Sequence, residues 1–138
     1  MSQRPHIYTP QEANRIIHEL MGDFPHLRSI RDEVIGLQNK VDVEEITSLG
    51  STGQLAKDAR QTMDGYHRQI LLLEKEFQKK LKRFEQVGCE LKALDPGLVD
   101  FYGQRDNELI YLCWKEGEDE IVFWHTLNGG FRGRQPLR

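Results

Sequence analysis

Seven polar residues near the two ends of the chain carry groups that could take part in chemistry. They supply carboxylates, an amide, a thiol, an imidazole and a guanidinium, and they are Glu12, Asn14, Asp95, Asp100, Cys113, His125 and Arg134. Two carboxylates with a histidine could hold a divalent metal or transfer protons, and a neighbouring arginine could clamp an anionic substrate. All of them except Cys113 are our candidate ligand-binding residues, and we assign no catalytic residue.

The spacing of these residues does not specify such chemistry. The sequence holds no Cys-x-x-Cys, His-x-x-x-His or His-Glu-x-x-His motif, so we expect no metal and no cofactor. Asp95 and Asp100 stand beside expected turns, where carboxylates accept hydrogen bonds from backbone N–H groups. Cys113 fits a buried strand position, and a backbone carbonyl could hold His125. We rank a structural role above ligand binding, and ligand binding above catalysis.

Two long apolar stripes with helical spacing lie between these groups. Apolar residues recur every three or four positions over residues 9–46 and again over 51–88, which predicts two amphipathic helices. Thr9, Pro10 and Glu12 form a capping box with proline at the first helical position, which marks the start of the first helix. The segment 47–53 is short and rich in small residues, so it predicts the tip of an antiparallel hairpin. Such a hairpin brings Glu12 alongside the end of the second helix.

The first helix contains a local conflict at residues 22–25. Pro25 lacks a backbone donor and crowds the preceding turn, and Gly22 is a weak helix former. The apolar spacing continues through this site, which favours a kinked but continuous helix. The alternative is a full break, with Asp23 capping a new helix that has Pro25 in its first turn.

After Gly88 the period changes from helical to alternating, which is typical of strands. We expect three or four antiparallel strands in meander order within residues 89–127. Asp95-Pro96-Gly97 predicts a type II turn with Pro96 and Gly97 at its centre. Residues 128–138 form a tail that covers one side of the sheet, unless a second molecule does so, and residues 1–8 form a short arm. The predicted fold is a single α+β domain over residues 1–138, a long helical hairpin followed by a small antiparallel sheet.

The charge balance argues against nucleic acid as a partner. The net charge is −3 at pH 7. One basic cluster is present, Lys79, Lys80, Lys82 and Arg83, but no aromatic residues are interleaved with it, so we interpret it as a solvated helix face. No apolar run approaches the roughly 20 residues of a membrane span, and no targeting segment opens the chain. With two cysteines, we expect a cytoplasmic protein whose thiols are reduced.

Several short strings at both ends of the chain resemble a known family. The strings are Glu12-Ala13-Asn14, Leu94-Asp95-Pro96-Gly97-Leu98-Val99-Asp100-Phe101, Leu112-Cys113-Trp114-Lys115, Gly117-Glu118, Trp124-His125 and Gly130-Phe131-Arg132-Gly133-Arg134. They are similar to the bacterial domain-of-unknown-function family numbered 2203. The seven polar residues all lie in these strings. The resemblance brings no established activity, and it implies that the end of the molecule that bears the motifs holds what the members share.

Two function classes are compatible with this sequence. In the first, the protein is a non-catalytic scaffold or adaptor that self-associates through its helices, and it could also bind another protein. Ile35, Leu71 and Leu72 fall beside the apolar stripes and stay uncovered in a two-helix hairpin, so we expect a homodimer that forms a four-helix bundle. In the second, a small-ligand-binding or metal-dependent enzyme has its site where the helices meet the sheet.

Arg134 is the most unusual of the candidate residues, because a loose arginine in a tail contributes little to folding. We expect Phe131 to anchor the tail in the core and to direct the Arg134 guanidinium toward Glu12 and Asp100.

Overall fold

The computed structural model describes residues 6–138, so the first five residues of the expected arm lie outside the described part of the chain. The end of that arm is fixed to the sheet. The Tyr8 side chain is buried, its backbone N–H donates to the Tyr102 carbonyl at 2.7 Å, and its hydroxyl donates to the Val87 carbonyl. The described chain forms two compact units, one made of the residues up to Pro25 with Leu81–Arg138, the other of His26–Lys80.

The fold is α+β, with three helices ahead of a five-stranded antiparallel sheet. The helices are α1 (Pro10–Leu20), α2 (Asp23–Thr47) and α3 (Gly53–Gln86). The capping box at the start of α1 is confirmed, since Thr9 Oγ1 accepts from the Glu12 N–H at 3.2 Å and Glu12 Oε1 accepts from the Thr9 N–H at 3.0 Å. No described helix is long and apolar enough to cross a membrane.

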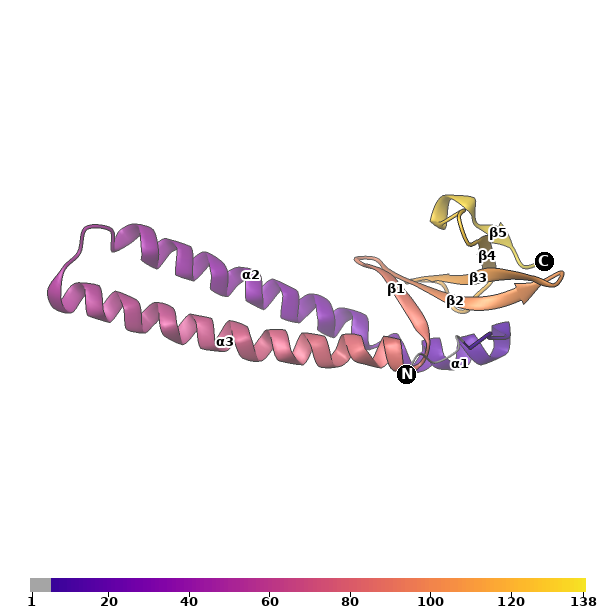
Figure 1. The fold of residues 1–138 in the computed structure, drawn as a ribbon, viewed down its shortest axis with the longest axis horizontal. Coiled ribbons are helices and arrows are strands. Elements are labelled where there is room, and N and C mark those ends of the chain that lie inside the picture. Colours follow the sequence, from indigo (N-terminus) through magenta and orange to yellow (C-terminus); the bar gives the residue numbers. More distant parts are fainter. Residues whose placement is uncertain (1–5) are drawn as a thin grey trace. The chain divides into compact units, whose positions relative to one another are not determined.

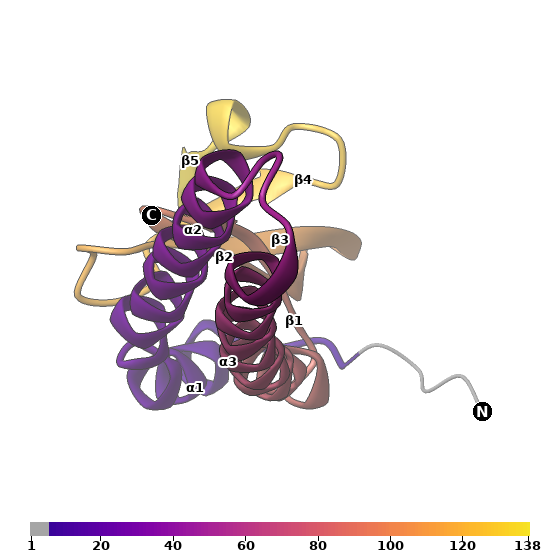
Figure 2. The same ribbon diagram turned by 90° about the vertical axis from the view of Figure 1, so that its left-hand side faces the viewer.

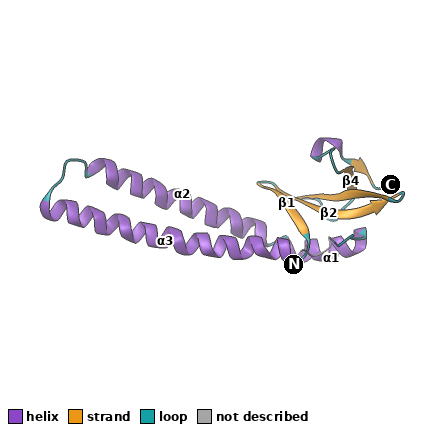
Figure 3. Ribbon diagram, in the orientation of Figure 1, coloured by secondary structure: helices purple, strands orange, loops and turns teal. Residues whose placement is uncertain are grey.

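The prediction of one continuous first helix over 9–46 is wrong. A turn at Met21 and Gly22 separates α1 from α2, and α2 begins at Asp23. The break places Pro25 in the first turn of a new helix, where its missing N–H would have had no helical partner. From there α2 and α3 run antiparallel and side by side (Figures 1 and 2), joined by a short loop at the hairpin tip (Figure 3).

The sheet is a meander in the order β1-β2-β3-β4-β5. Its strands are β1 (Cys89–Leu94), β2 (Gly97–Arg105), β3 (Glu108–Lys115), β4 (Phe123–Thr126) and β5 (Gln135–Pro136). Five strands replace the three or four that we expected, because the tail itself adds β5 through Phe123↔Pro136 and Trp124↔Gln135 pairs. A two-residue strand has no alternation that a sequence pattern could reveal.

The turn between β1 and β2 differs from the expected type II turn. Asp95 and Pro96 are its central residues, joined by a cis peptide bond, and Gly97 is already the first residue of β2. The glycine is required by packing, because a Cβ added there would lie 2.5 Å from Cδ1 of Phe24. The phenylalanine ring therefore rests directly on the backbone of this strand.

The core of the first unit lies between one face of the sheet and the helical segments of the same unit, which are α1, the start of α2 and the end of α3. Phe24 is at its centre, with its ring centroid 5.5 Å from that of Phe84 and 5.6 Å from that of Trp114. The apolar side chains of α1 that are buried are Ala13, Ile17 and Leu20. Figure 1 shows α1 on one side of the sheet and the segment after β4, with the 3-10 turn Phe131–Gly133, on the other side.

Candidate functional site

Three chemically capable side chains meet on the face of the sheet that does not pack on the helices. Asp100 of β2 stands directly opposite Cys113 of β3, and Cys113 stands opposite Phe123 of β4, two positions before His125. Side chains two positions apart on a strand share a face, so His125 lies on the same side as the other two. Asp100, Cys113 and His125 are 3%, 0% and 2% exposed. We call these three residues the buried cluster.

The hydrogen bonds of His125 indicate where the protons of the Asp100–His125 pair lie. Its Nδ1 is 2.7 Å from the Thr126 carbonyl oxygen, and because a carbonyl only accepts, Nδ1 carries a proton and donates it. Its Nε2 is 3.1 Å from both carboxylate oxygens of Asp100. A hydrogen bond across that gap requires one more proton, either on Nε2 or on the carboxyl group. In both arrangements the pair is electrically neutral, as burial demands.

The thiol of Cys113 is protonated at neutral pH. Burial, and then the negative charge of Asp100, raise its pKa to about 12, while the nearby Arg134 acts in the opposite direction. A nucleophilic cysteine needs a lowered pKa and access to solvent, and Cys113 has neither. His125 is also not placed to activate it, because both imidazole nitrogens are occupied by Thr126 and Asp100.

Polar and aromatic side chains continue from the buried cluster to the surface. The rings of Tyr102 and Tyr111 stack with centroids 4.9 Å apart, and the ring of Tyr111 lies 5.3 Å from that of His125. Burial, followed by the hydrogen bond with Tyr102 and the charge of Glu90, raises the pKa of Tyr111. Glu90 in turn forms an ion pair with Lys92 at 2.8 Å. This network links the buried cluster to charged side chains outside it.

Arg134 is pinned, but its partner differs from the expected carboxylates. Its Nη2 donates to Oε1 and Oε2 of Glu118 at 2.6 and 2.8 Å and to the Cys113 carbonyl at 3.3 Å. The guanidinium also lies 4.1 Å from the ring centroid of Phe123 and 4.9 Å from that of Phe131. The predicted contact with Glu12 or Asp100 is therefore wrong, because the tail runs beside β4 and reaches the turn after β3 instead.

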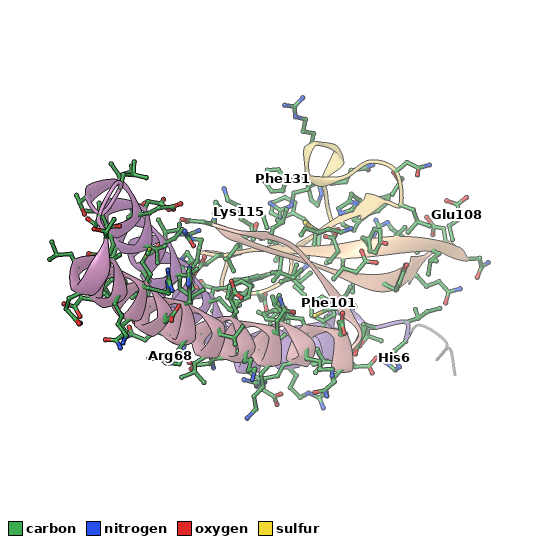
Figure 4. The ribbon with its side chains drawn as sticks, turned by 60° about the vertical axis from the view of Figure 1, so that its left-hand side comes forward. His6, Arg68, Phe101, Glu108, Lys115 and Phe131 are labelled. Atoms are coloured by element: carbon green, nitrogen blue, oxygen red, sulfur yellow. The ribbon has the colours of Figure 1, made fainter. Side chains whose placement is uncertain are left out.

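Phe131 does not anchor the tail in the core, contrary to expectation. It is 43% exposed, and Lys115 Nζ lies 5.6 Å from its ring centroid. Figure 4 shows both side chains at the surface of the sheet near the 3-10 turn. The ring shields one side of the Arg134 guanidinium rather than filling an apolar space.

The three other candidate residues lie apart from the buried cluster. Glu12 is the acid of the capping box and also contacts His6, and the Thr9 backbone N–H that it accepts lowers its pKa. Asn14 Oδ1 accepts from the backbone N–H of Ile121 at 2.6 Å, which fixes the segment before β4 to α1. Asp95 is exposed in the turn between β1 and β2. The structure therefore brings together two of the six candidates, Asp100 and His125.

A groove of about 1080 Å³ lies in the first unit, and the buried cluster does not line it. Of the six candidates, Asn14 lines the groove, together with apolar residues and the charged side chains of Arg105, Glu120 and Arg138. Arg105 is already engaged there, since its Nη1 donates to the Leu137 carbonyl at 3.3 Å and its guanidinium lies 5.0 Å from the Trp124 ring centroid.

Sequence reasoning missed two members of these networks. Glu118 appeared only within a family motif, and the signal for its role was the need of Arg134 for a carboxylate partner. Tyr111 was not singled out, because its position beside His125 depends on the register of β3 and β4. Cys113 was recognised as chemically capable but was not included among the candidate ligands.

Comparisons with known proteins support one assignment. Neither the curated proteins nor the solved structures gave a match to this chain. A family model described as an uncharacterised conserved protein, DUF2203, matches residues 6–137. That match covers the helices, the sheet and the tail, including every residue of the buried cluster. This chain therefore belongs to the DUF2203 family, as its short motifs indicated.

Proposed function

We propose that the protein is a non-catalytic scaffold that self-associates through the α2–α3 hairpin to form a homodimer with a four-helix bundle. The observation that carries this proposal is the apolar surface of the hairpin unit, His26–Lys80. Its buried apolar residues are Leu27, Ile30, Val41, Ala59 and Ile70. Its exposed large apolar residues are more numerous: Ile35, Val43, Ile46, Leu49, Leu55, Leu71 and Leu72. A helix pair that exposes more large apolar residues than it buries needs a further partner surface.

Three of these exposed residues line grooves that both helices form. One groove, of about 560 Å³, includes Ile35 and Leu71, and another, of about 520 Å³, includes Leu72 with Leu37 and Leu73. Ile35, Leu71 and Leu72 are 53%, 56% and 68% exposed. Since consecutive helix positions point about 100° apart, Leu71 and Leu72 present two sides of the hairpin. Both sides are therefore open to a second helix pair.

A second copy of the chain fits this surface in charge and length. The groove with Leu71 is lined by the cations Arg31 and Lys75 and by the anion Glu74. A surface with both charges can pair with itself under two-fold symmetry, because the cation of one copy then faces the anion of the other. The 25 residues of α2 extend for about 37 Å at 1.5 Å per residue, which is long enough for an interface of ordinary size.

The placement of the polar candidates favours a scaffold over an enzyme. Asp100 and His125 satisfy each other in a buried position, while Glu12 and Arg134 are committed to Thr9 and Glu118. An enzyme needs such groups to converge around a cavity that admits its substrate. The second class of function, a ligand-binding or metal-dependent enzyme, therefore has less support than self-association.

Light scattering on the full chain, coupled to size-exclusion chromatography at micromolar concentration, tests the proposal. We expect a mass of about 32 kDa for the parent, twice the 16.1 kDa of one chain. Leu71→Asp places a charge in the interface and should give the monomer mass, while the matched control Gln61→Asp adds the same charge at an exposed position of α3 outside both grooves. A parent with the mass of one chain, or a Leu71→Asp protein that stays dimeric, would reject the proposal.

A further inference from the structure

We propose that Asp100, Cys113 and His125 form a zinc site that ties strands β2, β3 and β4 together. A carboxylate oxygen, the cysteine sulfur and an imidazole nitrogen of these residues all lie within 4.8 Å of one another. Zinc binds sulfur at about 2.3 Å and nitrogen or oxygen at about 2.0–2.2 Å, so tetrahedral ligand atoms stand about 3–4 Å apart. Small side-chain rotations are enough to reach that geometry. The three ligands come from three adjacent, hydrogen-bonded strands, which fix their backbones.

His125 already has the orientation of a metal ligand. Histidines that bind metals through one ring nitrogen commonly donate the other N–H to a carbonyl or carboxylate, which fixes the ring and the tautomer. Here Nδ1 donates to the Thr126 carbonyl at 2.7 Å, and Nε2 is aimed at Asp100. The Nε2 atom is 3.1 Å from both carboxylate oxygens. An ion between the imidazole and the carboxylate could therefore bind Nε2 and one carboxylate oxygen, with the Cys113 sulfur as the third ligand and a buried water molecule in the fourth position.

The exchange of protons for zinc leaves the buried cluster neutral. Without metal, Asp100 and His125 share one proton across their hydrogen bond, and Cys113 keeps the proton of its thiol. A zinc ion replaces both protons, so a dication, a carboxylate, a thiolate and a neutral imidazole remain, and two protons leave to solvent. The net charge is zero before and after binding. Neutrality matters here because all three side chains are buried, where an uncompensated charge is costly.

The mixture of ligands selects the metal. Thiolate and imidazole suit zinc, whereas magnesium and calcium prefer sites made of oxygen ligands. Burial of all three residues points to a structural ion rather than a catalytic one, since a catalytic zinc keeps a position open to substrate. The site therefore adds cross-links within the sheet of the first unit and does not depend on self-association of the hairpin.

The parent protein provides the first test. The full chain is freed of metal with a chelator, dialysed, and titrated with zinc while bound metal is measured by elemental mass spectrometry. We expect one zinc per chain, release of protons on binding, and a higher melting temperature with zinc than with chelator. Cobalt in place of zinc should give the thiolate-to-cobalt charge-transfer band and the visible bands of a tetrahedral ion. A folded parent chain that binds neither metal at micromolar concentration would overturn the proposal.

Cysteine variants assign the metal to this site. Cys113→Ala should lose the charge-transfer band and the zinc-dependent rise in melting temperature. Cys89→Ala is the matched control, because Cys89 is the other buried cysteine and is not part of the buried cluster. It should keep both signals. If Cys113→Ala binds cobalt with the parent's spectrum, the site is wrong; if that variant does not fold, His125→Gln and the parent titration decide the outcome.

Discussion

Arg134 and Glu118, sixteen positions apart in the chain, form an ion pair at 2.6 Å in which their side chains are 12% and 20% exposed. Phe123 and Phe131 flank the guanidinium. The tail is therefore held to the turn after β3 by a charged contact that aromatic rings shield from water. Such a shielded pair depends on both members, since removal of one leaves a partly buried charge without its partner.

Replacement of Arg134 by alanine should destabilise the protein by about 1–3 kcal/mol, because Glu118 is left unpaired in a partly buried position. Arg134→Lys should recover part of that loss, since an ammonium cannot donate in the fork geometry or stack on the rings as a guanidinium does. Urea unfolding followed by circular dichroism measures both variants. Arg132→Ala, which removes an exposed arginine from the same tail, is the control and should match the parent. Urea unfolding curves that coincide for all four proteins would contradict this role.

A methyl group added at Gly97 should also be costly. The new Cβ of Gly97→Ala would lie 2.5 Å from Cδ1 of Phe24, whose side chain is completely buried. Either the ring or the strand has to move, and overpacking of this kind costs about 1–3 kcal/mol. Gly36→Ala tests the opposite case, because Gly36 lies within α2 with no atom near the position of its Cβ, so alanine should stabilise the helix by roughly 0.5–1 kcal/mol. Equal stabilities of the two variants would show that the Phe24 contact is unimportant.

The helices were predictable because their signals are local. Thr9 and Glu12 stand three positions apart, so a capping box can be recognised without knowledge of the fold. Apolar spacing gave the extent of α3 to within two residues at each end. The same spacing was misleading at Met21 and Gly22, since it continues through the turn that separates α1 from α2 just before Pro25.

The site was harder to predict, because its contacts depend on register and on the path of the tail. Asp100 and His125 are 25 positions apart and meet because β3 pairs with both of their strands. A shift of one residue in either pairing would have turned one of them to the other face of the sheet. Arg134 was recognised as pinned, but its choice of Glu118 required the two-residue pairing of β5 with β4, which leaves no pattern in the sequence.

The buried thiol of Cys89 should make stability depend on alkaline pH. Burial raises its pKa to about 12, while the thiol of the unfolded chain titrates near 9. The unfolded chain therefore loses this proton first as the pH rises, so the stability that the thiol contributes is intact below pH 9 and is lost between about pH 9 and 12.

Urea unfolding at pH 8 and pH 10 measures this effect, and Cys89→Ala should show a smaller decrease between the two pH values than the parent. Reaction with a thiol reagent at pH 8 gives a second readout. The peptide that contains Cys89 should become labelled after unfolding and remain largely unlabelled in the folded protein, because the thiolate is the reactive form. Rapid labelling of Cys89 in the folded chain would contradict its burial.

The contributions of Asp23 and Arg83 to stability should be coupled, because the two side chains form one ion pair. Nη1 of Arg83 donates to Oδ1 and Oδ2 of Asp23 at 3.1 and 2.9 Å, and this pair joins the start of α2 to the last turn of α3. The Asp23 side chain is 11% exposed and that of Arg83 is 48% exposed. Arg83→Ala should therefore destabilise the protein by about 1–2 kcal/mol, which is less than the loss of a partner from a fully buried pair would cost, because water reaches one side of the guanidinium.

A double-mutant cycle measures the coupling between the two residues. If Asp23→Ala is combined with Arg83→Ala, the destabilisation of the double variant should be smaller than the sum of the two single variants by about 0.5–1 kcal/mol. Lys82→Ala, which removes an exposed cation next to Arg83, is the control. Strict additivity in this double-mutant cycle would mean that the pair contributes nothing beyond its separate side chains.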